Sequence, residues 1–228
     1  MTYINLRQVA LVAKDLDAVL ADLHDTFALE VAFRDPAVAT FGLQNAVLPV
    51  GSQFIEVVSP VKDGTAAGRQ LDRMGGDGGY MVICHTDDQP PCRERAEKLG
   101  IRTALEFDDH GYLGWQLHPG DTGGSFLEID VQPGGEDPNG PWMPAGKDWH
   151  DAVCTDVVDG IAGVELEAPD PLATSARWTE LLDQDAFDNA GLRWTSGTKG
   201  VVEVDLHATD RARVGDTHTI CGVRFRLV

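Results

Sequence analysis

Three short, mostly apolar stretches of the sequence each carry one glutamate, and such isolated carboxyl groups could transfer protons or bind a metal. Glu56 lies in QFIEVV, Glu128 in SFLEID and Glu203 in GVVEVD. Alternate residues of a β-strand face opposite sides of the sheet, so each glutamate shares a face with apolar neighbours. An ionised carboxylate in that setting is costly unless it is paired, hydrogen-bonded or bound to a metal. These acids therefore either decorate a sheet edge or line a site.

Two further strand-like stretches place a polar residue on an otherwise apolar face. Gln8 lies in RQVALV and Tyr80 in GYMVIC, whereas the corresponding position of a third stretch holds Gly163. By the same alternation, His85 should point away from Tyr80, toward helices or solvent. If these strands lie side by side in one curved sheet, four side chains look into one cup: Gln8, Glu56, Tyr80 and Glu128.

A sequence pattern that occurs three times explains this spacing. Residues 9–29, 81–101 and 164–182 each read as a strand, an Asp-containing turn and a helix. Asp15 is the expected N-cap of the first helix. Short strands follow each helix, at about 29–34, 37–43 and 46–58, then 102–107, 111–118 and 125–131, then 192–196, 200–207 and 219–228. The sequence thus predicts an α+β fold of β-α-β-β-β units, two of them paired in a curved, cup-like mixed sheet and a third appended.

The domain organisation follows from where glycine and proline gather. Residues 1–132 are expected to form the domain of two paired units, with a short helix at TAAGRQLDRM between them. Residues 133–150 are rich in glycine and proline and read as a linker. Residues 151–228 are expected to form the third β-α-β-β-β-like unit, which has no partner unit in the sequence. Because such units work in pairs, an unpaired third unit would pack on the first two or on a second chain, and we expect a homodimer.

Residues 5–131 resemble the vicinal oxygen chelate superfamily, which includes glyoxalase I, methylmalonyl-CoA epimerase and extradiol dioxygenases. The stretch LHPGDTGGSFLEIDVQ (117–132) is similar to the Leu-His-Pro, Gly-Gly and Glu-bearing final strand of the epimerase-like branch. The stretch GTAAGRQLDRMGGDGGYMVI (64–83) is similar to its linker helix and glycine-rich entry into the next strand. The resemblance implies a divalent metal in the cup, held by residues at the positions of Gln8, Glu56, Tyr80 and Glu128, with a carboxylate of this shell acting as base.

The residue types at those positions restrict the chemistry. The first and third positions are commonly histidine in the superfamily, and here they are Gln8 and Tyr80. Gln8, Glu56 and Glu128 offer hard oxygen ligands, which suit Mg, Mn, Co or Ni better than Zn. A neutral phenol is a poor ligand, so Tyr80 is expected to donate a hydrogen bond. Iron-dependent ring cleavage uses two histidines and one carboxylate, and this shell lacks both histidines.

Several alternatives stay open. Glu56 and Glu128 could be rim carboxylates that face water or bond to Gln8 and Tyr80, and two facing carboxyls without a metal would raise one another's pKa. His118 and Trp115 are candidates for substrate binding, although a histidine before Pro119 can simply bond to its turn, and an aromatic residue can simply fill the core. Trp149-His150, in the linker, could fold over the cup as a lid.

Composition limits the partners. The 228-residue chain carries 37 acidic and 18 basic residues, a net charge of −19, which disfavours nucleic acid. We expect no membrane span, because the sequence has no apolar run of about 18 residues. It also starts directly in a strand pattern, so we expect a cytoplasmic protein with four reduced cysteines.

These observations predict a small-molecule enzyme of the isomerase, epimerase or lyase kind. It would remove a proton next to a carbonyl or thioester, with Glu128 or Glu56 as base and Tyr80 and Gln8 orienting the substrate, either with or without a divalent metal as Lewis acid. The alternative is a binding or resistance protein that holds a small molecule in the same cup without turnover or metal.

Overall fold

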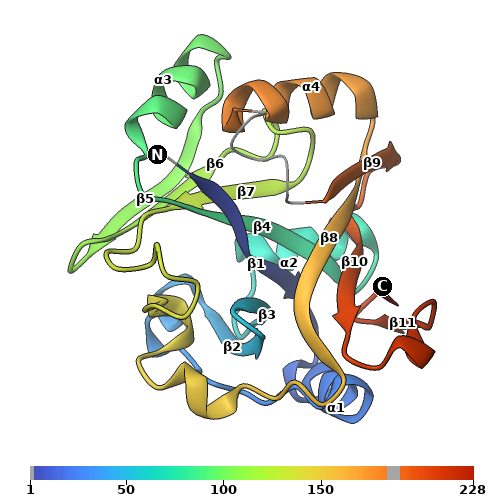
Figure 1. Cartoon of the computed structure of the whole chain (residues 1–228). Helices are drawn as coiled ribbons and strands as arrows, with labels where there is room; N and C mark the ends of the chain where they lie inside the picture. Colours follow the sequence, from blue (N-terminus) through green and yellow to red (C-terminus); the bar gives the residue numbers. More distant parts are fainter. Residues whose placement is uncertain (1–2, 184–190) are drawn as a thin grey trace.

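The computed structural model describes residues 3–183 and 191–228 and shows a mixed α+β fold with two sheets (Figure 1). Sheet A has seven strands in the order β2-β3-β1-β4-β7-β6-β5 and curls into a half-barrel. Its strands are β1 (Ile4–Val12), β2 (Leu43–Val50), β3 (Gln53–Pro60), β4 (Gly78–Thr86), β5 (Thr103–Asp109), β6 (Tyr112–Leu117) and β7 (Phe126–Asp130). We call its concave face the cup.

The first unit follows the predicted helix closely and departs from the predicted strands. Helix α1 (Leu16–Phe27) begins after Asp15, whose side chain accepts a hydrogen bond from the Ala18 amide, and it buries the predicted stripe of Leu16, Val19, Leu20, Leu23 and Phe27. The strands expected at 29–34 and 37–43 are wrong. Only an isolated bridge joins Phe33 to Val47, and a 3-10 helix, η1 (Pro36–Phe41), follows.

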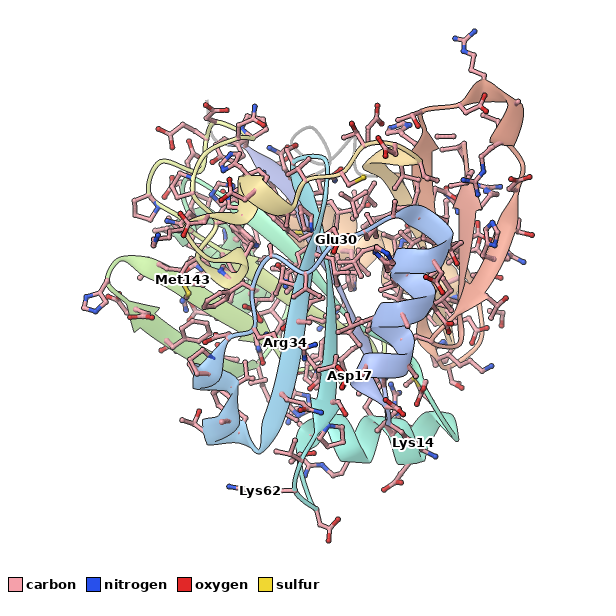
Figure 2. All side chains as sticks on the ribbon, turned by 90° about the horizontal axis from the view of Figure 1, so that it is seen from below. Lys14, Asp17, Glu30, Arg34, Lys62 and Met143 are labelled. Carbon is pink, nitrogen blue, oxygen red and sulfur yellow. The ribbon has the colours of Figure 1, made fainter. Side chains whose placement is uncertain are left out.

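The reason for that departure is local turn chemistry. The Asp35 side chain accepts a hydrogen bond from the Ala37 amide, and the proline at position 36 starts the helical turn without a backbone donor. The segment before it folds back on α1. Arg34 Nη2 lies 3.1 Å from Asp17 Oδ1, and both residues are labelled in Figure 2.

The second unit repeats the pairing of the first. Helices α2 (Ala66–Met74) and α3 (Pro90–Lys98) lie where the sequence predicts them. Strand β1 pairs in parallel with β3, and β4 pairs in parallel with β7, while β1 and β4 run antiparallel at the centre of the sheet. The two units therefore contribute equivalent strands to the cup, and their first and last strands lie next to one another.

Residues 158–183 and 191–228 carry sheet B, which has five strands in the order β11-β12-β10-β8-β9. The elements are β8 (Val158–Ala168), α4 (Pro171–Leu182), β9 (Leu192–Ser196), β10 (Gly200–Ala208), η4 (Arg211–Arg213), β11 (Thr217–Ile220) and β12 (Val223–Leu227). Two antiparallel central strands, β8 and β10, each have a parallel neighbour, β9 and β12. Sheet B thus repeats the central four strands of sheet A, two antiparallel strands each with a parallel neighbour. The third predicted unit therefore pairs its strands with one another in a sheet of its own.

Sheet B covers the convex face of sheet A, and the two share one apolar core. Val9, Val82 and Ile129 of sheet A belong to the same buried cluster as Val204 and Phe225 of sheet B. The approach is close, because a side chain at Gly79 would collide with the backbone carbonyl of Val201. The open half-cup that suggested a homodimer is therefore absent among the described residues, and the homodimer stays a prediction without that argument.

The connection between the sheets, residues 133–153, lies on the opposite side, across the cup. We call it the strap. It contains two 3-10 helices, η2 (Met143–Ala145) and η3 (Trp149–Ala152), which lie against β2 (yellow in Figure 1). Two strap residues, Trp142 and Trp149, are each only 1% exposed. The predicted linker is thus a packed element of the cup. None of the described helices is long and apolar enough to cross a membrane.

Candidate functional site

The register of sheet A brings three of the four predicted side chains to the cup face. Gln8 of β1 pairs with Phe54 of β3 on one side and with Ile83 of β4 on the other, and Ile83 pairs with Glu128 of β7. Glu56 lies two residues along β3 from Phe54 and shares its face. Gln8, Glu56 and Glu128 therefore line one continuous surface, as alternation along the strands predicts.

Glu56 is held by two amide groups. Gln8 Nε2 donates to Glu56 Oε2 at 2.9 Å, and Asn45 Nδ2 donates to Glu56 Oε1 at 2.7 Å. Burial raises the pKa of Glu56, and these two hydrogen bonds, which favour the ionised form, counter part of that rise. Both carboxylate oxygens thus have donors from the chain itself. Asn45 of β2 is a site residue that the sequence reasoning missed.

The strap completes this arrangement from the open side of the cup. Trp142 Nε1 donates to Gln8 Oε1 at 2.8 Å, so the Gln8 amide bridges the strap and Glu56. The Trp142 ring stacks on Phe54, with centroids 6.3 Å apart, and Trp149 meets Phe54 edge to face at 5.1 Å. Two indole rings therefore occupy the centre of the cup. Trp149-His150 was considered as a lid, and Trp149 lies inside the cup, with His150 stacked on its outer side.

A second carboxyl group stands beside Glu128. Asp130, fully buried two residues along β7, shares a hydrogen bond with Glu128 and accepts hydrogen bonds from the Tyr112 hydroxyl and the Trp115 backbone amide. Burial raises the pKa of Glu128 to about 7, aided by the nearby charge of Glu56. Burial, together with the charge of Glu128, also raises the pKa of Asp130 well above its usual value. The pair therefore retains a proton near neutral pH.

Asp130 was visible in the sequence as the next residue on the face of Glu128, in SFLEID. The signal that identifies it is an acid two positions from another acid in a buried strand, since two carboxyls so placed must share a proton or find a cation.

Tyr80 reaches the cup by a different route from the one expected. Ala10 pairs with Met81, and the next residue of β1, Leu11, pairs with Gly79, so Tyr80 is the extra residue of a β-bulge. Tyr80 and Met81 both pack on the cup side, and the Tyr80 ring lies 5.1 Å from that of Phe126. Burial raises the pKa of Tyr80 to about 12, and the charges of Glu56 and Glu128 add to the rise. The phenol stays neutral and can donate a hydrogen bond.

Comparison with known proteins shows which family the chain belongs to. A sequence profile described as a glyoxalase-like domain matches residues 9–182, which is most of the chain. The chain belongs to the glyoxalase-like family. This family places it in the vicinal oxygen chelate superfamily, as the motifs indicated. No curated protein matches the sequence.

Solved structures show how far the glyoxalase-like fold extends. A hypothetical protein from Staphylococcus aureus has a TM-score of 0.68 at 13% identity, and the match covers 99% of this chain and 98% of that one. A variant of the methylmalonyl-CoA epimerase from Streptomyces coelicolor, in complex with 2-nitronate-propionyl-CoA, has a TM-score of 0.51 at 19% identity, covering 57% of this chain and 98% of that one. A methylmalonyl-CoA epimerase in complex with methylmalonyl-CoA and NH4+ gives 0.51 at 21% identity, covering 57% and 95%. At these identities the likeness shows the fold alone.

Members of this superfamily commonly bind a divalent metal, and the residues present do not fit one. Within the described residues, no three His, Cys, Asp or Glu side chains converge as a metal site. Gln8 turns its nitrogen toward Glu56, and its oxygen, the atom that a metal would need, accepts from Trp142. Both oxygens of Glu56 already accept amide hydrogen bonds. The expected ligand set of Gln8, Glu56 and Glu128 is therefore tied to protein partners.

Two ring side chains, His85 and Trp115, lie on the opposite side of sheet A from the one expected from the sequence. His85 is buried with its ring 5.6 Å from that of Trp142, on the cup side, because the bulge at Tyr80 shifts the alternation of β4. Trp115 faces away from the cup and packs under Arg93 of α3, since Gln116 is the β6 residue that pairs with Glu128. Burial lowers the pKa of His85 to about 4, so its ring is neutral.

His118 lies outside the cup, in the turn after β6. Its Nδ1 accepts a hydrogen bond from the Gly120 amide at 3.1 Å, and Arg102 Nη2 lies 3.3 Å from the same atom. This geometry is the hydrogen bonding within the turn that the sequence left open as an alternative for His118. Neither His118 nor Trp115 lies on the cup face, and their role in substrate binding stays a prediction.

Glu203, the third lone glutamate, is satisfied by arginines on the outer face of sheet B. It is only 2% exposed, with Arg193 Nη2 2.8 Å from its Oε1 and Arg224 bonded to its Oε2. Asp205 beside it is paired with Arg193 and Arg226. This cluster explains the carboxylate in GVVEVD as one partner in an ion-pair network.

Proposed function

We propose that this glyoxalase-like protein is an isomerase- or lyase-type enzyme that removes a proton next to a carbonyl or thioester, with Glu128 as the base. The observation that carries the proposal is the Glu128–Asp130 pair. A general base works best when its pKa lies near the working pH, and burial brings the pKa of Glu128 to about 7. Asp130, whose own pKa is raised well above its usual value, keeps its proton and donates it in the hydrogen bond to the Glu128 carboxylate, which favours the ionised form that acts as base.

The surrounding residues supply the other parts of such a reaction. In the proposed step, the proton passes from the substrate carbon to a Glu128 oxygen. The electron pair of the broken C–H bond forms a double bond to the carbonyl carbon, and the π pair of the C=O bond moves to the carbonyl oxygen. The neutral hydroxyl of Tyr80 donates a hydrogen bond to that oxygen as its negative charge develops. Gln8 and Asn45 hold Glu56 in place, and their hydrogen bonds favour its ionised form, whose charge raises the pKa of Glu128.

Substrate entry in this proposal requires the strap to move. Trp142 and Trp149 occupy the cup in the form described, and Trp142 holds Gln8 by one hydrogen bond. Withdrawal of the indoles would open the face that carries Glu128 and free the Gln8 amide oxygen for a substrate group. Closure over a bound substrate would then exclude water from the reacting atoms.

The test measures proton exchange and needs no knowledge of the product. The protein is incubated in D2O with a panel of 2-oxo acids, 2-hydroxy ketones and acyl thioesters, and loss of the proton next to the carbonyl is followed by NMR. We expect exchange in at least one compound, slowed by about 100-fold or more in Glu128→Gln, because base catalysis contributes on this order. Glu94→Gln, an exposed residue of α3, serves as the matched control. Equal exchange in Glu128→Gln and the wild type would refute the role of Glu128.

A second candidate function is small-molecule binding without turnover. It is favoured by the pairing of Gln8 and Glu56 with Trp142 and Asn45, which leaves the cup polar groups satisfied without a substrate or metal. A compound that changes tryptophan fluorescence and shows no exchange in D2O would support this candidate over the enzyme.

A further inference from the structure

A cavity of about 220 Å³ lies beside the cup, at the end where β1 begins and β4 ends. Its walls come from the first residues of β1, the turn between β2 and β3, His85, the strap and β8; the residues that matter below are Arg7, Ser52, Gln53, Glu136, Pro138 and Ile161. Glu136 and Pro138 are exposed, so the cavity reaches the surface at the strap. The cavity is distinct from the Glu128–Asp130 pair, since neither residue lines it.

Arg7 is the unusual member of this wall. It is 5% exposed, and its guanidinium lies over two aromatic rings, with Cζ 5.3 Å from the Phe54 centroid and 5.4 Å from that of Trp142. Nη1 donates to the Pro138 carbonyl at 2.8 Å. Nε and Nη2 have no hydrogen-bond partner among the described residues, and no carboxylate in that part of the chain forms an ion pair with Arg7.

A buried guanidinium without an anion is costly, and this one is kept in place by two rings and a carbonyl. The free pair, Nε–H and Nη2–H, forms one edge of the guanidinium. Such an edge bonds both oxygens of a carboxylate at once. A small anion in the adjoining cavity would accept both hydrogen bonds and neutralise the charge of Arg7.

The rest of the wall selects among anions. Arg7 is the one cationic side chain among the described lining residues, because the second basic group, His85, is neutral with a pKa lowered by burial to about 4. Glu136 adds a negative charge at the rim, and the whole chain carries −19. One positive charge in an acidic protein favours a monoanion over a phosphate dianion.

The apolar part of the cavity wall restricts the size and polarity of the part of the ligand that lies beyond the anionic group. Ile4, Leu6 and Ile161 line the cavity and are buried. Gln53 is already committed, since its Nε2 donates to the Leu6 carbonyl at 3.0 Å and its Oε1 accepts from the Ile161 amide at 2.8 Å. The volume is below the roughly 300 Å³ of pockets that enclose larger ligands. These features fit a short aliphatic chain.

We propose that this cavity binds a small carboxylate with a short apolar body, whose carboxylate pairs with Nε–H and Nη2–H of Arg7. Both donors are covered in the free protein, so binding displaces the side chain or the strap residues beside it. Trp142, which packs against the guanidinium, then reports binding through its fluorescence. The proposal concerns binding alone and holds whether or not Glu128 transfers protons.

The experiment titrates the whole 228-residue chain with acetate, propionate, pyruvate, butyrate and inorganic phosphate, using isothermal calorimetry and tryptophan fluorescence, with propionamide as the uncharged control. We expect a carboxylate to bind with a Kd on the order of 1 mM or tighter, and Arg7→Gln to weaken it about tenfold to a hundredfold. Glu136→Gln, at the exposed rim, should tighten binding by about twofold to fivefold.

Ser52→Leu tests the cavity without touching Arg7. It fills the space, so it should abolish carboxylate binding, and it keeps the proposal testable if Arg7→Gln does not fold. The proposal is overturned if no carboxylate binds, if binding survives both Arg7→Gln and Ser52→Leu, or if phosphate or propionamide binds as well as the carboxylates do.

Discussion

Replacing Glu128 by glutamine should stabilise the protein at pH 8 and have little effect at pH 4.5. The pKa of Glu128 rises from 4.5 to about 7 on folding, because the carboxyl is buried. Between these two pH values the folded state keeps a proton that the unfolded state has released, so stability falls as the pH rises. At about 1.4 kcal/mol per pH unit, the ionisation of Glu128 costs roughly 3 kcal/mol above pH 7. Glutamine resembles the protonated carboxyl in shape and bears no charge.

Urea denaturation of the wild type and of Glu128→Gln from pH 4.5 to 8.5 measures this effect. The difference in the free energy of unfolding should grow from near zero to roughly 3 kcal/mol in favour of the variant, and level off above pH 7. Titrating groups remote from Glu128 are common to both proteins and cancel in the difference. Removal of the Glu128 charge also lowers the pKa of Asp130, which adds to the advantage of the variant at high pH. Glu94→Gln, exposed on α3, should show no such growth. A difference that does not change with pH, or a variant less stable than the wild type at pH 8, would refute the reasoning that Glu128 is a buried acid.

Two further substitutions test the strap and the outer face of sheet B. Trp142→Phe removes the indole N–H that donates to Gln8 Oε1 and leaves a buried amide oxygen without its partner, so urea denaturation should show a loss of about 1–3 kcal/mol; an unchanged midpoint would mean that the strap is not held there. Glu203→Gln leaves Arg193 and Arg224 without their shared acid and should cost about 1–3 kcal/mol at low salt, with a smaller loss at about 1 M salt; equal losses at both salt concentrations would contradict an ion-pair role.

The parts of the site that the sequence predicted are those governed by strict alternation. Glu56, Glu128 and Gln8 lie on regular stretches of β3, β7 and β1, so their common face follows from the period of a strand alone. Helix α1 was equally predictable, because an N-cap aspartate and a stripe of apolar residues both mark it. In each case the signal is local, within the element itself or its first flanking residue.

The sequence patterns did not predict the β-bulges. Strand β4 pairs Met81 with Ala10 and then Gly79 with Leu11, and β1 pairs Leu6 with Cys84 and then Gln8 with Ile83. Each shift turns two consecutive residues toward the cup, and one of the two bulges brings Arg7 over the rings of Phe54 and Trp142. Nothing in the sequence marks these positions, since a bulge depends on how the partner strand fits. His85 was misplaced, and Arg7 overlooked, for this one reason.

The role of the strap was equally hidden, and it links the two halves of the molecule. Strand β7 ends at Asp130 in sheet A, and β8 begins at Val158 in sheet B, which covers the convex face of sheet A. The segment between them crosses the concave face first and leaves Trp142 and Trp149 in the cup.

A ligand that enters the cup must therefore displace a segment tied to both sheets. The strap bonds to sheet A through the contact of Trp142 with Gln8 and forms one wall of the Arg7 cavity, which Ile161 of β8 closes on the side of sheet B. Occupation of the cavity and opening of the cup act on the same residues, so each should change the free energy of the other. If a carboxylate in the cavity draws the strap away from the Trp142–Gln8 contact, the cup opens more readily; if it fixes the strap, the cup stays closed. The sign of that coupling decides whether the carboxylate site promotes or restrains access to Glu128.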